Sequence, residues 1–430
     1  MSIRIKHVFA LLAALALASC GGGGSKGNAQ IRLLNLSTGY SSLDLITNID
    51  ADDNDDDKTQ ASSVGLETVS SYVDLDPDNY TIKLKRTGSG SVLRSFAGEQ
   101  LVEDTINTYV AFGEVGAFGA LRLDDTQDDA DSGETKLSVA NLSSAGSLDV
   151  YITDADVDLP DTTPVVSSVS STFSSISVDS GTFRLRVTAA GDSSDVRLDV
   201  SNFTLADKGV AALIFTSTQG GTLANAIYMP QKGQPTKLTN TRSRVRAAIA
   251  VANGANASVQ VAGTSVLATA TAGVISSRYT LLPSGSQPVT LVVNGAAVAV
   301  PNVGLTAGAD YTLLVWGTAA SPQTSLVVDD NRLPSGAQSK LRLLNGMSTL
   351  AAPLTLSLDF SPVIEGTLVG QVSDPVEVTS GTDRQFDVSN TSTAANILTK
   401  TGLSLQSSSV YTFFMTDNGA TPIGVLRRDR

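Results

Sequence analysis

The sequence predicts an all-β protein made of four tandem immunoglobulin-like antiparallel β-sandwich domains, preceded by a signal peptide and a flexible tether. Three observations support this prediction. Segments in which apolar and polar residues alternate recur along the chain, and a period of two is typical of half-buried strands. Apolar residues at helical spacing are hard to find after residue 30, and the richness in Ser, Thr, Gly and Val disfavours helices. The pattern also repeats about every hundred residues, which is the usual size of one such sandwich.

The chain opens with a leader. Arg4 and Lys6 precede an unbroken run of eleven apolar residues, which is too short to span a bilayer and has the length of a signal-peptide core. The run ends in Leu17-Ala18-Ser19-Cys20, which contains the only cysteine of the chain. We therefore interpret residues 1–19 as a signal peptide. An ordinary signal peptide with an incidental cysteine is the alternative.

The end of this run resembles the lipobox of bacterial lipoproteins, in which the cysteine thiol is lipidated and the cysteine becomes the first residue of the mature chain. The resemblance implies that Cys20 carries acyl chains such as palmitate and ties the protein to a membrane. Several acyl chains, at about 0.8 kcal/mol per buried methylene, hold a soluble body where a single chain is marginal. Residue 21 is Gly and not Asp, which resembles the outer-membrane sorting pattern of Gram-negative bacteria. The periplasmic face and the cell surface both stay open as locations.

Residues 20–29 are rich in glycine and predict a flexible tether. Beyond the tether, the clearest landmark is a strongly apolar strand that returns every 100 or 101 residues, at Tyr109, Val210, Tyr311 and Tyr411. A strand ending in Asn opens three of the units, at 31–35, 137–141 and 341–345, and the third unit has a looser version. Turns rich in Asp, Pro and Gly separate the strands within a unit. These landmarks predict domains at residues 30–126, 135–235, 242–333 and 339–430.

Over essentially all of the mature chain, these landmarks resemble the bacterial secreted domain-of-unknown-function family numbered 4397. The matching segments are Arg-Leu-Leu-Asn at 32–35 and 342–345, together with residues 148–152, 181–183 and 306–312. The resemblance implies a string of β-sandwich domains and a location at the cell surface. It brings no catalytic residue with it.

The composition excludes most enzyme chemistry. His7 is the only histidine and Cys20 the only cysteine, and both lie within the first twenty residues. A mature chain would therefore lack Ser-His and Cys-His nucleophile pairs and the usual zinc ligands. We predict that the protein is not an enzyme, and a carboxylate-based glycan hydrolase is the alternative that remains. A formal net charge of −13 would repel a phosphate backbone, so nucleic acid is not expected as a partner.

Acidic residues gather at 50–57 and in the equivalent loop of the second unit. Calcium is one interpretation, because alternate aspartates on a loop can direct several oxygens at one ion. The candidate ligands are Asp50, Asp52, Asn54, Asp154, Asp156 and Asp158. The helix-loop-helix calcium pattern is broken, since Asp55 stands where Gly is required and Ala61 where Glu belongs. The favoured interpretation is a solvated acidic loop that resists aggregation, without a cofactor.

Two non-enzymatic roles then compete. The favoured one is a binding or adhesive protein that contacts a protein, a matrix component or a polysaccharide. The alternative is a structural spacer, with four domains in a row extending from the membrane. Trp316, the only tryptophan, lies in an apolar strand and is expected to pack in the core and not to stack on a sugar. Tyr228 and Tyr279 are further candidate contact residues with the same bias towards packing.

Overall fold

The computed structural model describes residues 27–49, 56–334, 336–419 and 421–430, and within these ranges all helix or strand structure is β-strand. The predicted all-β class with tandem β-sandwich domains is confirmed. In the same ranges, no helix could cross a bilayer. Residues 1–26, which include Cys20, and the acidic-loop residues Asp50, Asp52 and Asn54 lie outside the described part.

The first domain consists of two sheets that face each other across one apolar core. Its strands are β1 (Ala29–Leu36), β2 (Ser42–Asn48), β3 (Lys58–Gly65), β4 (Thr68–Val69), β5 (Val73–Leu75), β6 (Asn79–Arg86), β7 (Val92–Gln100), β8 (Ile106–Phe112) and β9 (Gly119–Asp124). One sheet has the order β4-β1-β8-β9, with β5 also beside β1, and the other has the order β3-β2-β6-β7. Leu33, Leu45 and Ile82 are completely buried between the sheets. Each such side chain contributes about 1.5–3 kcal/mol by leaving water.

The second domain repeats this plan. Its strands are β10 (Glu134–Asn141), β11 (Leu148–Thr153), β12 (Val166–Val169), β13 (Ser174–Asp179), β14 (Gly181–Ala189), β15 (Asp192–Leu205), β16 (Gly209–Ser217), β17 (Ala224–Pro230) and β18 (Thr236–Leu238). The sheet orders are β13-β10-β16-β17-β18 and β12-β11-β14-β15. Val139, Leu185 and Phe215 are completely buried in its core.

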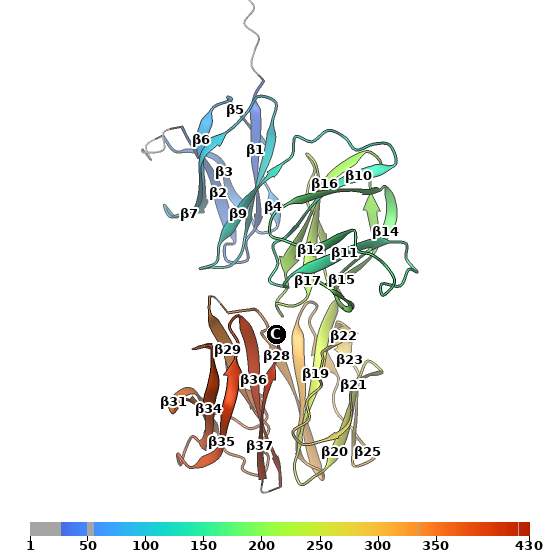
Figure 1. Cartoon of the computed structure of the whole chain (residues 1–430), viewed down its shortest axis with the longest axis vertical. Coiled ribbons are helices and arrows are strands. Elements are labelled where there is room, and N and C mark those ends of the chain that lie inside the picture. Colours follow the sequence, from blue (N-terminus) through green and yellow to red (C-terminus); the bar gives the residue numbers. More distant parts are fainter. Residues whose placement is uncertain (1–26, 50–55, 335, 420) are drawn as a thin grey trace, which may run out of the picture.

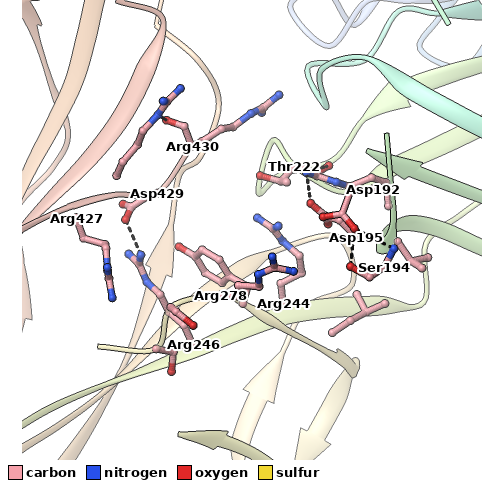
Figure 2. Close-up of a pocket in the computed structure, with 17 residues that line it drawn as sticks. Asp192, Ser194, Asp195, Thr222, Arg244, Arg246, Arg278, Arg427, Asp429 and Arg430 are labelled. Carbon is pink, nitrogen blue, oxygen red and sulfur yellow. Dashed lines mark hydrogen bonds and ion pairs between the residues drawn. The ribbon is translucent and has the colours of Figure 1, made fainter. Parts of the chain in front are cut away.

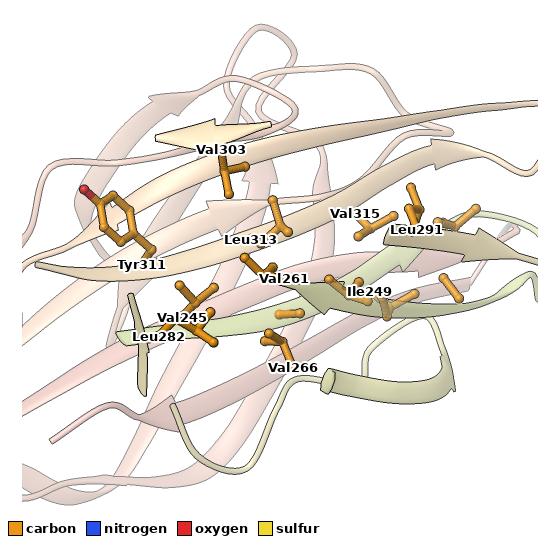
Figure 3. Packing of buried hydrophobic residues seen from close by; sticks show 14 of the residues in the cluster. Val245, Ile249, Val261, Val266, Leu282, Leu291, Val303, Tyr311, Leu313 and Val315 are labelled. Carbon is orange, nitrogen blue, oxygen red and sulfur yellow. The ribbon is translucent and has the colours of Figure 1, made fainter. Parts of the chain in front are cut away.

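The third domain has the same two sheets and a small extra ribbon. Its strands are β19 (Arg242–Val251), β20 (Asn256–Val261), β21 (Thr264–Thr271), β22 (Thr280–Pro283), β23 (Gly285–Gln287), β24 (Val289–Val293), β25 (Ala296–Val298), β26 (Val303–Leu305), β27 (Asp310–Thr318) and β28 (Ser321–Asp329). The sheet orders are β22-β19-β27-β28 and β21-β20-β24-β25, and β23 pairs with β26. Val245, Ile249 and Leu313 lie in a core of mostly aliphatic side chains (Figure 3).

The fourth domain completes the series. Its strands are β29 (Gln338–Asn345), β30 (Leu354–Leu358), β31 (Ser361–Thr367), β32 (Gln371–Val372), β33 (Val376–Thr379), β34 (Gly381–Asn390), β35 (Asn396–Leu405), β36 (Ser409–Asn418) and β37 (Thr421–Arg428). The sheet orders are β32-β29-β36-β37, with β33 also beside β29, and β31-β30-β34-β35. The rings of Phe386 and Phe413 pack in the core with their centroids 5.3 Å apart.

One strand pair in each domain departs from the antiparallel arrangement. β1 runs parallel to β8, and the same parallel pairing joins β10 to β16, β19 to β27 and β29 to β36. A parallel pair needs a long connection between its strands. Here the strands of the opposite sheet lie between the two partners in sequence and supply that connection. We call the sheet that contains the parallel pair the pairing sheet.

The Asn that ends the opening strand holds the turns beside it. Asn35 donates from Nδ2 to the carbonyl oxygen of Val64 at 3.0 Å and accepts the amide of Ser37 at 3.0 Å. The strand registers place Ile249 at this position in the third domain. The Ile249 side chain cannot form these hydrogen bonds, and its main-chain amide donates to the carbonyl oxygen of Val274 at 2.9 Å. The third repeat looks looser in the sequence because an apolar side chain takes the place of the buried Asn amide.

The four domains pack as two side-by-side pairs (Figure 1). The pairing sheets of the first and second domains meet in an apolar cluster that includes Leu34 and Ile214. Those of the third and fourth domains meet in a second cluster that includes Leu314 and Phe414. The row of four domains assumed for a spacer is therefore wrong. The domains lie side by side because the outward face of each pairing sheet is also apolar and is buried against the neighbouring domain.

The two pairs are joined to each other. The Gly220 amide of the second domain donates to the carbonyl oxygen of Gly308 in the third at 3.0 Å, and the Asn331 amide donates back to Gly220 at 3.1 Å. Arg332 lies 3.3 Å from the carboxylate of Glu114 in the first domain. Polar contacts thus link the pairs, whereas apolar clusters hold each pair together.

We expect the change of Phe414 to Ala to lower the free energy of unfolding by about 3–5 kcal/mol, because it leaves a cavity between the third and fourth domains. The urea midpoint of the mature protein measures this loss. Phe360, whose side chain is 79% exposed, provides the matched control, and Phe360→Ala should leave the midpoint unchanged. Equal midpoints for both variants would contradict the pairing of these sheets.

Candidate functional site

A buried ionic cluster lies between the third and fourth domains, next to the apolar cluster. It contains one Arg, one Thr and one Asp from each domain, namely Arg246, Thr312 and Asp329 with Arg342, Thr412 and Asp429. Each arginine and threonine lies on adjacent parallel strands at paired positions. The aspartate follows on the next strand or just beyond its end. We call this set the arginine-threonine-aspartate cluster.

The arginines of the cluster cross from one domain to the other. Arg246 contacts the carboxylate of Asp429 at 2.5 Å, and Arg342 contacts that of Asp329 at 2.8 Å. Arg342 also lies 3.1 Å from Asp429 within its own domain. Both aspartate side chains are completely buried, and the two arginine side chains are 3% and 4% exposed. Removing any one of these four charges would leave the other three buried with one charge not compensated.

The cluster charges keep Asp329 ionised. Burial acts to raise the pKa of Asp329, but Arg342 and Arg246, together with hydrogen bonds from Thr312 and Tyr279, outweigh it and hold the pKa below its ordinary value. Burial raises the pKa of Tyr279 well above its usual range, so this phenol stays neutral and donates to Asp329 at 2.7 Å. Asp329 is therefore charged and Tyr279 neutral at neutral pH.

The first domain holds the same three residues, whereas the second domain has lost all three. Arg32 donates to Thr108 at 2.8 Å and lies 3.1 Å from Asp125. The strand registers place Ser138, Ala212 and Gln231 at the equivalent positions of the second domain. Gln231 donates to backbone oxygens of Asp125 and Gln127 across the interface. One charged face thus meets a neutral one in the first pair, while two charged faces interlock in the second.

A tyrosine covers the arginine in both odd-numbered domains. The Arg32 guanidinium lies 4.2 Å from the ring centroid of Tyr72, and that of Arg246 lies 4.7 Å from the ring of Tyr279. Tyr72 and Tyr279 also donate to the aspartates of their clusters. A ring face attracts a cation, so each tyrosine stabilises the buried arginine by stacking as well as by its hydroxyl.

A pocket of about 470 Å³ opens beside this cluster, where the second, third and fourth domains meet (Figure 2). The volume is typical of sites that take small ligands. Its lining includes seven arginines, which are Arg197, Arg244, Arg246, Arg278, Arg427, Arg428 and Arg430. Its acidic lining residues are Asp192, Asp195 and Asp429. The arginines therefore outnumber the acids on a chain whose formal net charge is −13.

Three domains supply these arginines, and five of the seven lie on strands. Arg197 lies on β15 of the second domain, and Arg244 and Arg246 lie on β19 of the third. Because side chains alternate along a strand, Val245, which lies between the two β19 arginines, faces the core. Arg427 lies on β37 of the fourth domain. Arg430 follows β37 and donates to the carbonyl oxygens of Ser144 and Gly221 in the second domain.

Several pocket charges are already balanced. Arg244 contacts completely buried Asp310 through two hydrogen bonds of 2.8 and 2.7 Å. Arg197 lies 2.6 Å from Asp195. Nevertheless, burial and the repulsion of Arg197 and Arg244 lower the pKa of Arg430 to about 10. Positive charge in the pocket is therefore not fully neutralised by the protein.

The structure places the candidate calcium ligands of the second domain and Tyr228 away from this pocket. Asp154, Asp156 and Asp158 are exposed after β11, and the described residues contain no group of three or more acidic, His or Cys side chains that could hold a metal. The calcium prediction for the other loop concerns residues outside the described part. Tyr228 packs on Phe203 with ring centroids 5.3 Å apart.

Two of the aromatic candidate contact residues, Trp316 and Tyr279, lie in different parts of the structure. Trp316 packs at the apolar cluster between the third and fourth domains and donates from its indole nitrogen to Ser325 at 2.9 Å. It therefore packs as expected, although between two domains and not inside one. Tyr279, the other candidate, does line the pocket.

Sequence reasoning missed the arginines of the pocket. One signal was available, because residues 241–338 carry 5 basic against 3 acidic residues in an otherwise acidic chain. The spacing of Arg244 and Arg246 also places both on one face of a strand. Their meeting with Arg197 and Arg430 depends on domain packing, which the sequence pattern does not specify.

The fold and the pocket define a class of protein, a tandem β-sandwich protein whose domains pair through their sheets and form a cationic pocket at a three-domain junction. The chain belongs to the family described as Domain of unknown function (DUF4397). The family profile matches residues 29–151 and 243–352, together more than half of the chain. Each match begins at the opening strand of an odd-numbered domain and ends in the next domain.

No curated protein matches the chain at a significant level. Among solved structures, it is similar to the crystal structure of CBMbc (family CBM26) from Eubacterium rectale Amy13K in complex with maltoheptaose, at 13% identity and a TM-score of 0.15, covering 45% of this chain and 95% of that one. It is also similar to the Bacillus anthracis TIE protein, at 9% identity and a TM-score of 0.15, covering 93% of this chain and 69% of that one. At these TM-scores neither similarity extends to a binding site.

We expect the change of Asp429 to Ala to destabilise the protein by about 3–5 kcal/mol, because it leaves Arg246 and Arg342 buried with half of their negative charge removed. Chemical unfolding of the mature protein measures the loss. Asp154→Ala removes an exposed aspartate and is the control, with an expected change within about 0.5 kcal/mol. A similar small change for both variants would show that the cluster does not hold the domains.

We also expect stability to fall as the pH drops below about 4. The folded pKa of Asp329 is depressed, so its contribution is present above the unfolded pKa and is lost as the pH falls through the folded pKa. Melting temperatures from pH 7 to pH 2.5 measure this loss, and Asp329→Asn should give a flatter curve than wild type. Parallel curves would contradict this role for Asp329.

Proposed function

We propose that the protein is a lipid-anchored, non-catalytic binding or adhesive protein of the bacterial outer membrane. The observation that carries the binding role is the arginine-lined pocket, to which three of the four domains contribute. A pocket of this size at a domain junction is typical of ligand sites. The end of the leader, Leu17-Ala18-Ser19-Cys20, supports the lipid anchor at Cys20.

The arrangement of the domains favours binding over the spacer alternative. A spacer needs reach, and reach is greatest when domains follow one another in a line. Side-by-side pairs shorten the body and instead bring β15, β19 and β37 to one junction. The ligand classes open to this role are a protein, a matrix component and a polysaccharide.

The carboxylates of the pocket disfavour the glycan hydrolase alternative. A glycosidase needs one carboxylic acid that stays protonated, which an apolar setting favours. Asp195 and Asp429 instead lie against arginines at 2.6 and 2.5 Å. Asp192 accepts a hydrogen bond from the Ser194 hydroxyl at 2.5 Å, and this bond lowers its pKa. None of these three carboxylates therefore lies in the apolar setting that a catalytic acid needs.

Fractionation and binding test this proposal together. We expect wild type to remain with the outer membrane and Cys20→Ala to appear in the soluble fraction, because the variant cannot be acylated. The anchored protein on cells should also increase retention on one surface of a panel coated with matrix proteins and envelope polysaccharides. Normal membrane fractionation of Cys20→Ala would refute the anchor. Equal retention of cells with and without the protein on every surface would refute the adhesive role.

A further inference from the structure

We infer that the pocket at the junction of the second, third and fourth domains binds a ligand with two or more oxyanion groups, such as an acidic oligosaccharide or a polyphosphate. This inference names the ligand chemistry of the site and rests on the proposed binding function. It follows from the number of guanidinium groups, their present partners and the shape of the pocket.

The protein leaves part of the pocket charge without a carboxylate. Among the described residues, no Asp or Glu side chain lies within 4.0 Å of the guanidinium nitrogens of Arg427, Arg428 or Arg430, which donate to other oxygens instead. Arg427 donates to the carbonyl oxygen of Ile275 at 3.1 Å. Arg428 donates to the side-chain oxygen of Gln406 at 2.5 Å and to the main-chain oxygen of Arg430 at 3.0 Å. Arg430 donates to three carbonyl oxygens. The neutral acceptors among these oxygens satisfy donors but leave the positive charge in place.

Two of the three acids of the pocket are already paired with arginines. Asp429 is shared by Arg246 and Arg342, and Asp195 is paired with Arg197. Asp192 makes no ion pair within 4.0 Å in the described part of the chain, and this single carboxylate cannot neutralise Arg278 together with the three arginines of the fourth domain. A ligand with its own negative charges would neutralise these arginines through charge-assisted hydrogen bonds, for which the planar guanidinium is well suited.

Buried donors support the same ligand chemistry. Nη2 of Arg246, Nε of Arg197 and Nε of Arg427 are buried and make no hydrogen bond within the described part of the chain. Unsatisfied buried donors are rare, and each costs free energy. All three belong to side chains that line the pocket. Oxyanions at the pocket would lower this cost by stabilising the guanidinium charges.

The distribution of the arginines calls for more than one anionic group. Five of them lie on β15, β19 and β37, whereas Arg278 precedes β22 and Arg430 follows β37. Together they surround a space of about 470 Å³, so that one carboxylate or phosphate would contact only part of the lining (Figure 2). A ligand with several charged groups could contact Arg278 and Arg427 at the same time. The chain as a whole is acidic, so the pocket field would attract such a ligand only at short range.

Calorimetric titration of the mature protein with trigalacturonate and with pyrophosphate tests the inference. We expect at least one probe to bind in 50 mM salt and to bind more weakly in 500 mM salt, because mobile ions screen the attraction. The double variant Arg278→Gln, Arg427→Gln should raise the Kd about a hundredfold, since each of the two lost charge-assisted contacts accounts for about a factor of ten. Trigalacturonate alone would indicate an acidic sugar, and pyrophosphate alone would indicate a phosphate ligand.

Two further variants make the result decisive. Arg94→Gln removes an exposed arginine of the first domain and should bind like wild type. Arg278→Glu changes an exposed pocket residue, so the fold should remain while binding is lost. Absence of binding by both probes, or equal Kd values for wild type and the pocket variants, would overturn the inference. Cell retention that persists in the pocket variants would leave the adhesive role standing and discard only this site.

Discussion

The arrangement of the molecule depends on how each pairing sheet covers its second face. A sandwich needs only one buried face per sheet, but here the opposite face of the pairing sheet is also apolar around Leu34 in the first domain and Leu314 in the third. That face is covered by the neighbouring domain. Within it lies the arginine-threonine-aspartate cluster, whose charges tolerate burial only when correctly opposed. The apolar contacts supply most of the attraction, and the ionic contacts restrict which partner and which register can satisfy it.

The two domain pairs balance their buried arginine charges in different ways. In the second pair, Arg246 and Arg342 each reach a carboxylate of the other domain, so both faces must be charged. In the first pair, Arg32 is balanced within its own domain, and the second domain offers the neutral Gln231. A charged face set against the wrong partner would bury an uncompensated charge, at a cost of several kcal/mol. Domain order along the chain is therefore matched to the chemistry of the faces.

Much of the fold could be predicted from the sequence because strand alternation and turn residues are local signals. The repeat predicts apolar strands at Tyr109 and Tyr311, and the structure has β8 and β27 there, each an inner strand of its sheet. The parallel pairing of β1 with β8 was not predicted, since register between distant strands is not a local property. The pocket was missed for the same reason. Arg197, Arg246 and Arg430 are far apart in sequence and meet only after domains have packed, whereas the conspicuous aspartates at 154–158 remain in solvent.

The matching of faces within each pair, charged with neutral in the first and charged with charged in the second, has a consequence for how such a chain can change in length. The family profile begins anew at the first and third domains, which share the tyrosine that covers the arginine. Gain or loss of two consecutive modules would keep every such surface matched with a complement. Gain or loss of one domain would expose the apolar outward face of a pairing sheet and its arginine to water, or would pack two faces whose charges do not match. A pair of domains is thus the smallest unit that keeps its apolar interface covered when the chain lengthens or shortens.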